Sequence, residues 1–492
     1  MGYTQKVVIV GAGISGLACA FRLKQLGIRS IVLEAADRPG GVIATLRRNG
    51  FLFELGPQCP RFPASVWRLV REIGLEPEFI AGDPKAKRYI VKNGQLQLAP
   101  FSPAGLLVTG LLGLSSKLRI LTEVLSNSQP PRHEESLAEF VQRKFGSETL
   151  ENLVDPLIST VFFGDAYKMG MQSAFPALVD WERKHGSLVR GALRARALRR
   201  ATEETDSRPA SVPSNQAAGS LKVTDALPSL GSFRDGMGRL PEKLADVLGE
   251  QIRYGVAVES ARQTNDAAGE AQECWEISTA QGESIIVNQL VLCVPAYEAA
   301  RIIRSSAPAI ASQLRSIEYA PMHGVAAAYD RQQVRHPLDG FGFMVPRKEG
   351  LRTICTFWNS SLFPQRAPEG KVLLTSFVRS DANENSGSAK QETLARAVET
   401  ENARILAIPG APEDREVWSH PQALPQFNVG HARTVAALNE PAALPANLYL
   451  AGNYLKGRSI GDCVDLAFQV AQSIHSRLHH NSIQPVGSSS SE

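Results

Sequence analysis

The sequence predicts an α/β protein in which both ends of the chain build one dinucleotide-binding domain. Residues 6–10 (KVVIV) form a β-branched strand that leads into GAGISG and then an apolar-periodic helix. Near the other end, residues 447–451 (NLYLA) form a strand before a glycine-rich loop and a second apolar-periodic helix. Strand candidates between them indicate a further sheet. We therefore expect a discontinuous Rossmann-like domain, a mixed-sheet domain and a helical lid.

Composition excludes several classes of protein. With 492 residues, the chain is long enough for two or three domains. Its formal charge of +4 is small and dispersed, so we expect no nucleic-acid partner. The six cysteines include no CxxC pair, and the nine histidines no HExxH motif. We expect reduced thiols and no metal site.

The N-terminal residues and one apolar run bear on localisation. The chain runs almost directly into its first strand without a signal-peptide pattern, which predicts a cytoplasmic protein. The run Ala104–Leu114 is about half the ~20 residues that a membrane span requires. Beside Lys117 and Arg119, it fits either a buried lid helix or peripheral contact with the inner face of the cell membrane.

Further patterns give the expected order of elements. Residues 65–75 and 115–126 have helical periodicity, as do residues 136–153, and 87–98 fit a hairpin turning at Asn93-Gly94. Residues 201–220 lack an apolar period and predict a surface loop. The strand candidates of the further sheet are residues 285–294, 324–330 and 371–378.

These elements divide into five predicted segments. They are 1–83, the first part of the nucleotide-binding domain; 84–210, a helical lid or membrane-interface domain; 211–255, a second part and linker; 256–425, a substrate-binding sheet with a return strand near 285–295; and 426–492, the third part and tail.

The glycines of GAGISG provide the chemistry for binding a pyrophosphate. Gly11, Gly13 and Gly16 allow a tight turn, close approach of the backbone to phosphates and close helix–sheet packing. Glu34 follows the next strand, 18 residues after Gly16, where its carboxylate can accept hydrogen bonds from a ribose. The expected contacts in this unit also include Ala12, Ile14, Ser15 and Ala35.

Three further motifs resemble the flavin amine oxidase superfamily, which implies FAD as the cofactor. They are the RPGG motif directly after Glu34, the FELGP segment and the GNYLKGRSIGDC loop before the last helix. The resemblance implies that a second helix points at the ribityl-pyrophosphate part of the cofactor. Its implied cofactor residues are Arg38, Gly40, Gly41, Gly56, Pro57, Gln58, Val258, Gly452, Asn453, Ser459, Ile460 and Gly461.

Longer stretches resemble the oxygen-dependent protoporphyrinogen oxidase family, which includes the coproporphyrinogen oxidases. They are AKRYIVKNGQLQLAP, FPALVDWERKHGSLVRG, HPLDGFGFMVP and LYLAGNYLKGRSIGDC, and the resemblance covers nearly the whole chain except 201–220 and the last dozen residues. It implies that Arg88 pairs with a substrate propionate, as the planar fork of a guanidinium suits a carboxylate. The other implied substrate residues are Phe163, Gly164, Gly342, Phe343, Phe357 and Trp358.

The resemblance implies oxidation of protoporphyrinogen IX to protoporphyrin IX with O2 as acceptor and release of H2O2. Oxidation of coproporphyrinogen III stays open as the alternative, with Lys87, Arg88 and Lys92 as a basic cluster for its extra carboxylates. Amine oxidation, carotenoid desaturation and a non-catalytic flavoprotein stay open on the same fold. Peripheral membrane contact, a homodimer and hand-over of product to a ferrochelatase also stay open.

Overall fold

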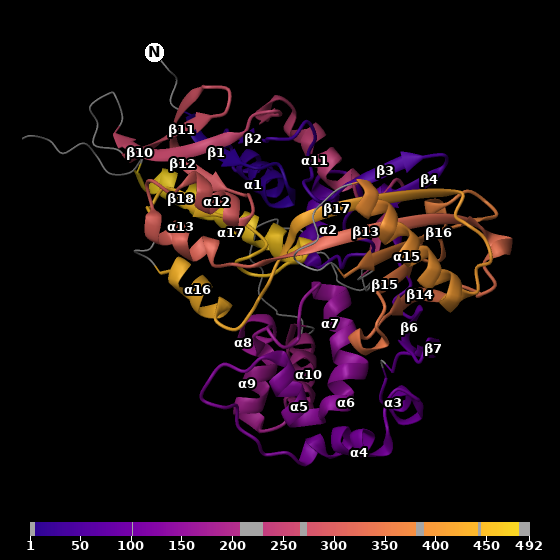
Figure 1. Ribbon diagram of the computed structural model, residues 1–492. Coiled ribbons are helices and arrows are strands. Elements are labelled where there is room, and N and C mark those ends of the chain that lie inside the picture. Colours follow the sequence, from indigo (N-terminus) through magenta and orange to yellow (C-terminus); the bar gives the residue numbers. More distant parts are fainter. Residues whose placement is uncertain are drawn as a thin grey trace, which may run out of the picture.

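The computed structural model has two seven-stranded sheets and a group of helices, arranged as three regions in Figure 1. It describes residues 5–100, 102–206, 230–265, 273–379, 388–440 and 444–481. The mixed α/β class and the Rossmann-like core expected from the sequence are confirmed.

The first sheet combines strands from three distant parts of the chain. The N-terminal strand β1 pairs in parallel with β2 on one side and β12 on the other, and the C-terminal β18 pairs in parallel with β12. Residues of β1 are fully buried at Val7 to Ile9, as expected for a central strand covered on both faces. The strands are β1 (Gln5–Val10), β2 (Ile31–Leu33), β9 (Ile252–Arg253), β10 (Val258–Asn265), β11 (Glu273–Thr279), β12 (Ser284–Leu292) and β18 (Leu448–Leu450).

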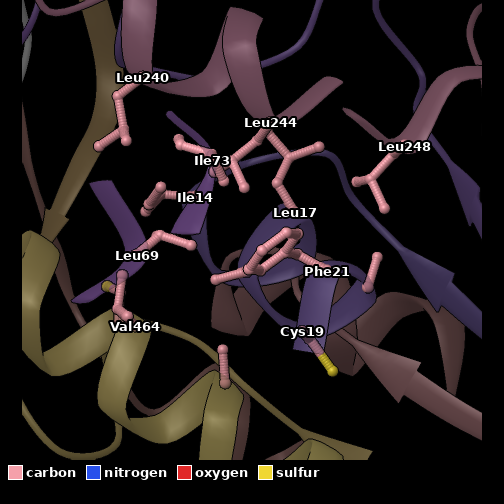
Figure 2. Close-up of a cluster of buried hydrophobic side chains, with 14 of the residues drawn as sticks. Ile14, Leu17, Cys19, Phe21, Leu69, Ile73, Leu240, Leu244, Leu248 and Val464 are labelled. Atoms are coloured by element: carbon pink, nitrogen blue, oxygen red, sulfur yellow. The ribbon is translucent and has the colours of Figure 1, made fainter. Parts of the chain in front are cut away.

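Helices from distant parts of the chain cover this sheet and share one core. Figure 2 shows Leu17 and Phe21 of α1 close to Leu244 of α11, with Val464 of α17 nearby. Helix α11 buries one face, with leucines four residues apart at 240, 244 and 248, whereas α1 is buried on all sides from Ile14 to Phe21. The helices around this sheet are α1 (Ile14–Gln25), α2 (Ala64–Glu72), α11 (Arg239–Leu248), α12 (Ala296–Ile302), α13 (Pro308–Arg315) and α17 (Ile460–Asn481).

The second sheet has the order β17-β13-β16-β15-β14-β6-β7 and includes the predicted hairpin. The turn is as expected, since Asn93 and Gly94 both have positive φ, at 53° and 73°. Helix α15 (Ser388–Leu406) packs on one face of the sheet. The strands are β6 (Lys87–Lys92), β7 (Gln95–Leu98), β13 (Tyr319–Asp330), β14 (Gly340–Met344), β15 (Thr353–Trp358), β16 (Lys371–Val378) and β17 (Asp414–Pro425).

The helical region begins after this hairpin and lies at the bottom of Figure 1. The predicted helix over 136–153 is broken at Gly146, whose φ of 87° ends α5. Ser136 and Glu139 form a capping box at the start of α5. The helices are α3 (Pro103–Val108), α4 (Leu114–Thr122), α5 (Leu137–Phe145), α6 (Ser147–Thr149), α7 (Asp155–Phe162), α8 (Met171–Ala174), α9 (Pro176–His185) and α10 (Leu188–Asp206).

Three features differ from the segments that the sequence predicted. Strands β6 and β7 fall in the predicted lid range 84–210 but lie in the second sheet. The reason is that β6 pairs in parallel with β14. Strands β10 to β12 all belong to the first sheet. The expected return strand near 285–295 is β12, and β10 and β11 extend the same sheet beside it in antiparallel pairing. Helix α10 includes residues 201–206 of the predicted loop, where alanine and glutamate favour a helix; residues 207–220 lie outside the described part.

Candidate functional site

The glycine loop after β1 forms a cradle whose shape depends on the absence of side chains. Gly11 has a φ of 100°, and an added Cβ at Gly16 would lie 1.9 Å from the Gly11 carbonyl oxygen. An added Cβ at Gly13, by contrast, meets nothing within 4 Å. The space in front of Gly13 is therefore open, and it lies at the N-terminus of α1.

The N-terminus of α1 has no side-chain cap, since Gly13 is its N-cap residue. Its free N–H groups and the helix dipole therefore favour an anionic group such as a pyrophosphate. The RPGG motif lies beside this turn, because the Gly40 amide donates to the Ala12 carbonyl at 2.8 Å. Arg38 stabilises the same loop by donating from Nη2 to the Gly41 carbonyl at 2.9 Å. The two motifs thus form one surface at the N-terminus of α1, and the donors of that helix end suit a phosphate.

Glu34 follows β2, as the sequence predicts. Its carboxylate accepts hydrogen bonds from the amides of Ala12 at 2.6 Å and Ala36 at 2.9 Å. A carboxylate has about four acceptor sites, so Glu34 keeps capacity for the hydroxyls of a ribose. Ala35 lies exposed beside it. These residues fit the nucleotide half of FAD.

The C-terminal motif brings a second helix N-terminus to the same place. Burial raises the pKa of the Cys463 thiol, in the first turn of α17, to about 11, and a hydrogen bond with Ser15 in the first turn of α1 acts against this rise. Ser459 caps α17 by accepting from the Asp462 amide at 3.1 Å. An added Cβ at Gly461 would lie 2.5 Å from Pro63, so glycine permits this close packing.

The remaining predicted cofactor residues have mainly internal contacts. The Gln58 side chain donates to the carbonyls of Glu54 and Gly56, both at 2.9 Å, and accepts from Asn359 at 2.7 Å. An added Cβ at Gly56 would lie 2.2 Å from the Val42 carbonyl oxygen. Gly452 packs under the Tyr454 ring, and Ile14 and Ile460 contribute to the core while Pro57 and Asn453 are half-buried.

Val258 is placed differently from the other predicted cofactor residues. Its side chain is buried in a core cluster of the first sheet, and its carbonyl accepts from Arg301 at 2.8 Å. The structure therefore gives its side chain and its carbonyl oxygen a role in the fold.

Several predicted substrate residues lie together on one face of the second sheet. The guanidinium Cζ of Arg88 lies 4.6 Å from the centre of the Phe341 ring, which lies 5.6 Å from the Phe357 ring. The Phe357 ring contacts Phe377 at 5.9 Å, and Phe377 contacts Phe163 at 5.1 Å. We call Phe341, Phe357, Phe377 and Phe163 the aromatic row.

Two predicted substrate residues lie elsewhere. Phe343 and Trp358 are buried on the opposite face of the sheet, where Trp358 contacts the Tyr89 ring at 5.5 Å. Strand alternation gives neighbouring residues opposite faces, so Phe357 and Trp358 cannot share a pocket. The structure therefore assigns these two side chains to the core.

A bulge explains why Phe341 takes the position that we expected for Phe343. The register between β14 and β6 shifts between Gly340 and Gly342, and Gly342 has a φ of 137°. An added Cβ at Gly342 would lie 2.0 Å from the Thr356 carbonyl oxygen. The bulge turns Phe341 towards Phe357, and no pattern in the sequence distinguishes the two phenylalanines.

Phe163 and Gly164 connect the aromatic row to the lid. Phe163 ends α7 in the left-handed conformation with a φ of 49°, which is uncommon for a bulky residue. An added Cβ at Gly164 would lie 2.8 Å from the Gln426 side-chain oxygen. The end of α7 is thus packed against the segment that follows β17.

The predicted basic cluster separates in the structure. Lys87 pairs with Asp339 at 2.5 Å, and Lys92 donates to the Gly110 carbonyl at 2.6 Å. Burial lowers the pKa of the Arg88 guanidinium, while the Cys59 thiol raises it and Arg61 lowers it. Arg88 is thus the member of this cluster that contacts the aromatic row.

Within the described part of the chain, no group of three or more His, Cys, Asp or Glu side chains is placed to hold a metal ion. Among the helices whose residues are described, none combines the length and apolar character needed to cross a membrane.

Comparison with known proteins shows the family of this chain. Residues 14–475 match the family described as flavin containing amine oxidoreductase. The chloroplastic protoporphyrinogen oxidase of Nicotiana tabacum is 33% identical, over 95% of this chain and 85% of the relative. The coproporphyrinogen III oxidase of Bacillus subtilis is 26% identical, over 93% of this chain and 95% of the relative.

A solved structure supports the fold. The putative protoporphyrinogen oxidase from Exiguobacterium sp. 255-15 superposes with a TM-score of 0.75, at 23% identity and with coverage of 97% of this chain and 100% of that chain. The predicted FAD cofactor and oxidoreductase class are confirmed by the family match. The chain belongs to the flavin containing amine oxidoreductase family and, within it, to the branch of protoporphyrinogen and coproporphyrinogen III oxidases.

Proposed function

We propose that the protein oxidises protoporphyrinogen IX to protoporphyrin IX and passes the electrons to O2. The observation that carries this proposal is the aromatic row, which has the Arg88 guanidinium at one end. Aromatic faces suit a large apolar macrocycle, and a guanidinium suits its propionate. FAD, when bound, supplies the two-electron acceptor, and three cycles remove six electrons and six protons to give three H2O2.

The chain's own residues position the substrate and exclude water. Phe341 and Phe357 present apolar surface to the macrocycle, while Arg88 fixes its rotation by holding one carboxylate. Coproporphyrinogen III is the second candidate, because the chain is also similar to the Bacillus subtilis enzyme. Lys87 and Lys92 both have partners within the protein. Their ammonium groups are therefore engaged and do not serve the extra carboxylates of coproporphyrinogen III, which favours protoporphyrinogen IX.

The test measures absorption and fluorescence of the purified, FAD-loaded protein given each porphyrinogen in air, with H2O2 measured in parallel. We expect porphyrin fluorescence to rise with protoporphyrinogen IX and three H2O2 to form per porphyrin. A control without protein corrects for spontaneous oxidation. A flat trace with both substrates, despite bound FAD, would assign the protein to another reaction of this family.

We further propose that the lid makes peripheral contact with the cell membrane. Its helices α3 and α4 and the turn Glu123–Leu125 after α4 carry apolar side chains that are more than half exposed, whereas Leu111 and Leu112 of the predicted apolar run are buried. Such a patch favours contact with a lipid interface, where a poorly soluble substrate collects. We call Leu107, Val108, Leu114, Leu118, Leu121 and Leu125 the apolar patch.

The other partner and location predictions stay predictions. They are the cytoplasmic location, the homodimer and the hand-over of product to a ferrochelatase.

A further inference from the structure

A short loop that contains predicted cofactor residues is closed by one buried side chain. We call residues 55–59, which follow β4 (Phe51–Glu54), the Gln58 loop. The Gln58 side chain is buried, and its Nε2 donates to the carbonyls of Glu54 and Gly56, both at 2.9 Å. These bonds use both N–H groups of the amide and hold it in one orientation. The amide oxygen, Oε1, is left to accept from another part of the chain.

The donor to this oxygen comes from the second sheet. Asn359 is the first residue of α14 (Asn359–Leu362), directly after β15, and its Nδ2 donates to Gln58 Oε1 at 2.7 Å. The Gln58 and Asn359 side chains are only 5% and 2% exposed, so water does not compete for this bond. Asn359 lies two residues after Phe357, a member of the aromatic row. One buried hydrogen bond thus joins the Gln58 loop to the strand that carries the row.

A buried ion pair joins the same two parts of the chain. Nη2 of Arg366 lies 2.9 Å from Oε1 of Glu54, and neither side chain is more than 1% exposed. Arg366 ends the turn Pro364–Arg366, which follows α14, and it also donates to the Ser232 hydroxyl at 2.6 Å. Glu54 also accepts from the Met237 amide at 3.0 Å. Because separating a buried pair leaves two charges uncompensated, the pair holds the end of β4 at a fixed place beside α14.

The last residue of the Gln58 loop, Cys59, lies near Arg88. Burial lowers the pKa of the Arg88 guanidinium, and the Cys59 thiol acts in the opposite direction. An added Cβ at Gly82 would lie 3.2 Å from Cys59 Sγ and 3.6 Å from Phe363 Cζ, so the thiol is also close to the residue that follows α14. The Gln58 loop therefore lies against the second sheet near the Arg88 end of the aromatic row.

We propose that Gln58 and Asn359 are positioning residues that set the distance between the flavin ring and a macrocycle on the aromatic row. This inference rests on the proposed function. Both side chains are buried and act through the backbones that they join. Transfer of a hydride requires the reacting atoms to lie about 3–3.5 Å apart, so a small shift of the Gln58 loop slows this step more than it weakens binding.

The test measures the anaerobic rate of flavin reduction by saturating porphyrinogen, by stopped-flow absorbance. The variants are Asn359→Leu, Gln58→Met and the double variant, which keep side chains of similar shape and remove the hydrogen bond. We expect flavin reduction in each single variant to be about tenfold slower, with KM changed by less than about twofold. Because the two side chains act through one bond, the double variant should be about as slow as either single variant.

Two further measurements and a control separate positioning from loss of structure. The Kd of the apoprotein for FAD and the rate at which O2 reoxidises the photoreduced flavin do not depend on where the substrate lies. Both values should stay within about twofold of the wild type. The matched control is Asn447→Leu, which removes the buried hydrogen bond from the Trp275 indole at 2.9 Å in the first sheet. It should lower the melting temperature and leave flavin reduction unchanged.

Each contrary outcome has its own meaning. Unchanged flavin reduction in Asn359→Leu, or an equal slowing in Asn447→Leu, would overturn the inference. Single effects that multiply in the double variant would also overturn it, because the two side chains would then act independently. Loss of FAD binding in both single variants would show that the bond maintains the cofactor site instead. If no porphyrinogen reduces the flavin of the wild type, the proposed function itself has failed.

Discussion

The Arg88 guanidinium lies 4.6 Å from the centre of the Phe341 ring, so a cation and an aromatic face lie side by side at one end of the aromatic row. Such stacking holds the planar group in one orientation, and its Nη1 also donates to the carbonyls of Ala86 at 3.3 Å and Pro84 at 3.5 Å. This pairing of a fixed charge with apolar surface distinguishes the position from an ordinary exposed arginine.

Replacing Arg88 with methionine should weaken substrate binding without affecting the flavin. We expect KM for the porphyrinogen to rise about tenfold or more, the loss typical of one charge-assisted hydrogen bond. Lys87→Met is the matched control, because the neighbouring Lys87 pairs with Asp339 instead. An unchanged KM for Arg88→Met would remove the propionate assignment.

Phe341 and Phe343 should respond differently to the same truncation. Phe343→Ala leaves a cavity in a buried cluster and should lower the free energy of unfolding by about 3–5 kcal/mol. Phe341→Ala, at a half-buried site, should cost less stability and raise KM several-fold instead. Urea unfolding and steady-state kinetics measure both effects, and the reverse pattern would contradict the assignment of faces.

The sequence predicted the nucleotide-binding unit well because its signals are local. A strand, three spaced glycines, a helix and an acid within about 30 residues determine that geometry directly. The face of β14 on which Phe341 and Phe343 each lie could not be predicted in the same way. It depends on a bulge at Gly340–Gly342, which alternation in the sequence does not show.

The contacts of Arg458, in the loop before α17, were missed for a related reason. Its partners, Phe162, Pro425 and Phe427, come from segments far from it along the chain. Nothing within the loop motif indicates which segments its guanidinium contacts. Contacts of this kind become visible only once the tertiary structure is known.

Replacing Gly13 with alanine should weaken the binding of FAD without lowering the stability of the fold. Its φ of −68° is accessible to alanine, and an added Cβ meets no protein atom within 4 Å. Gly13→Ala should therefore fold normally and contain less FAD, because the methyl group enters the cradle. Gly16→Ala, where the Cβ would lie 1.9 Å from a carbonyl oxygen, should lower the melting temperature as well. Absorbance at the flavin band and thermal unfolding distinguish the two variants.

Because of Glu182, the free energy of unfolding of the lid should fall as the pH becomes acidic. Despite burial, hydrogen bonds from Arg143, Ser128 and Lys144 lower the pKa of its carboxyl to about 2. The folded pKa lies below the unfolded value, so this stabilisation is present above about pH 4.5 and is lost as pH falls towards 2. Removal of one partner of a buried pair costs about 3 kcal/mol, so Glu182→Gln should lose about that much near pH 7.

The measurement for Glu182 compares the free energy of unfolding of Glu182→Gln and wild type from pH 7 to pH 3. The difference between them should shrink as the pH falls. A constant difference over this range would show that the charge of Glu182 does not contribute to the stability of the lid.

The apolar patch provides a direct test of membrane contact. Val108 and Leu114 are 84% and 83% exposed, so serine at both positions removes little packing but much apolar surface. We expect the double variant to bind vesicles of phosphatidylcholine and phosphatidylglycerol about tenfold more weakly, with kcat in detergent unchanged. Leu193→Ser, which removes a 60% exposed side chain from another lid helix, is the matched control. If the double variant binds vesicles as tightly as the wild type, or if the control is weakened equally, the patch is not the contact surface.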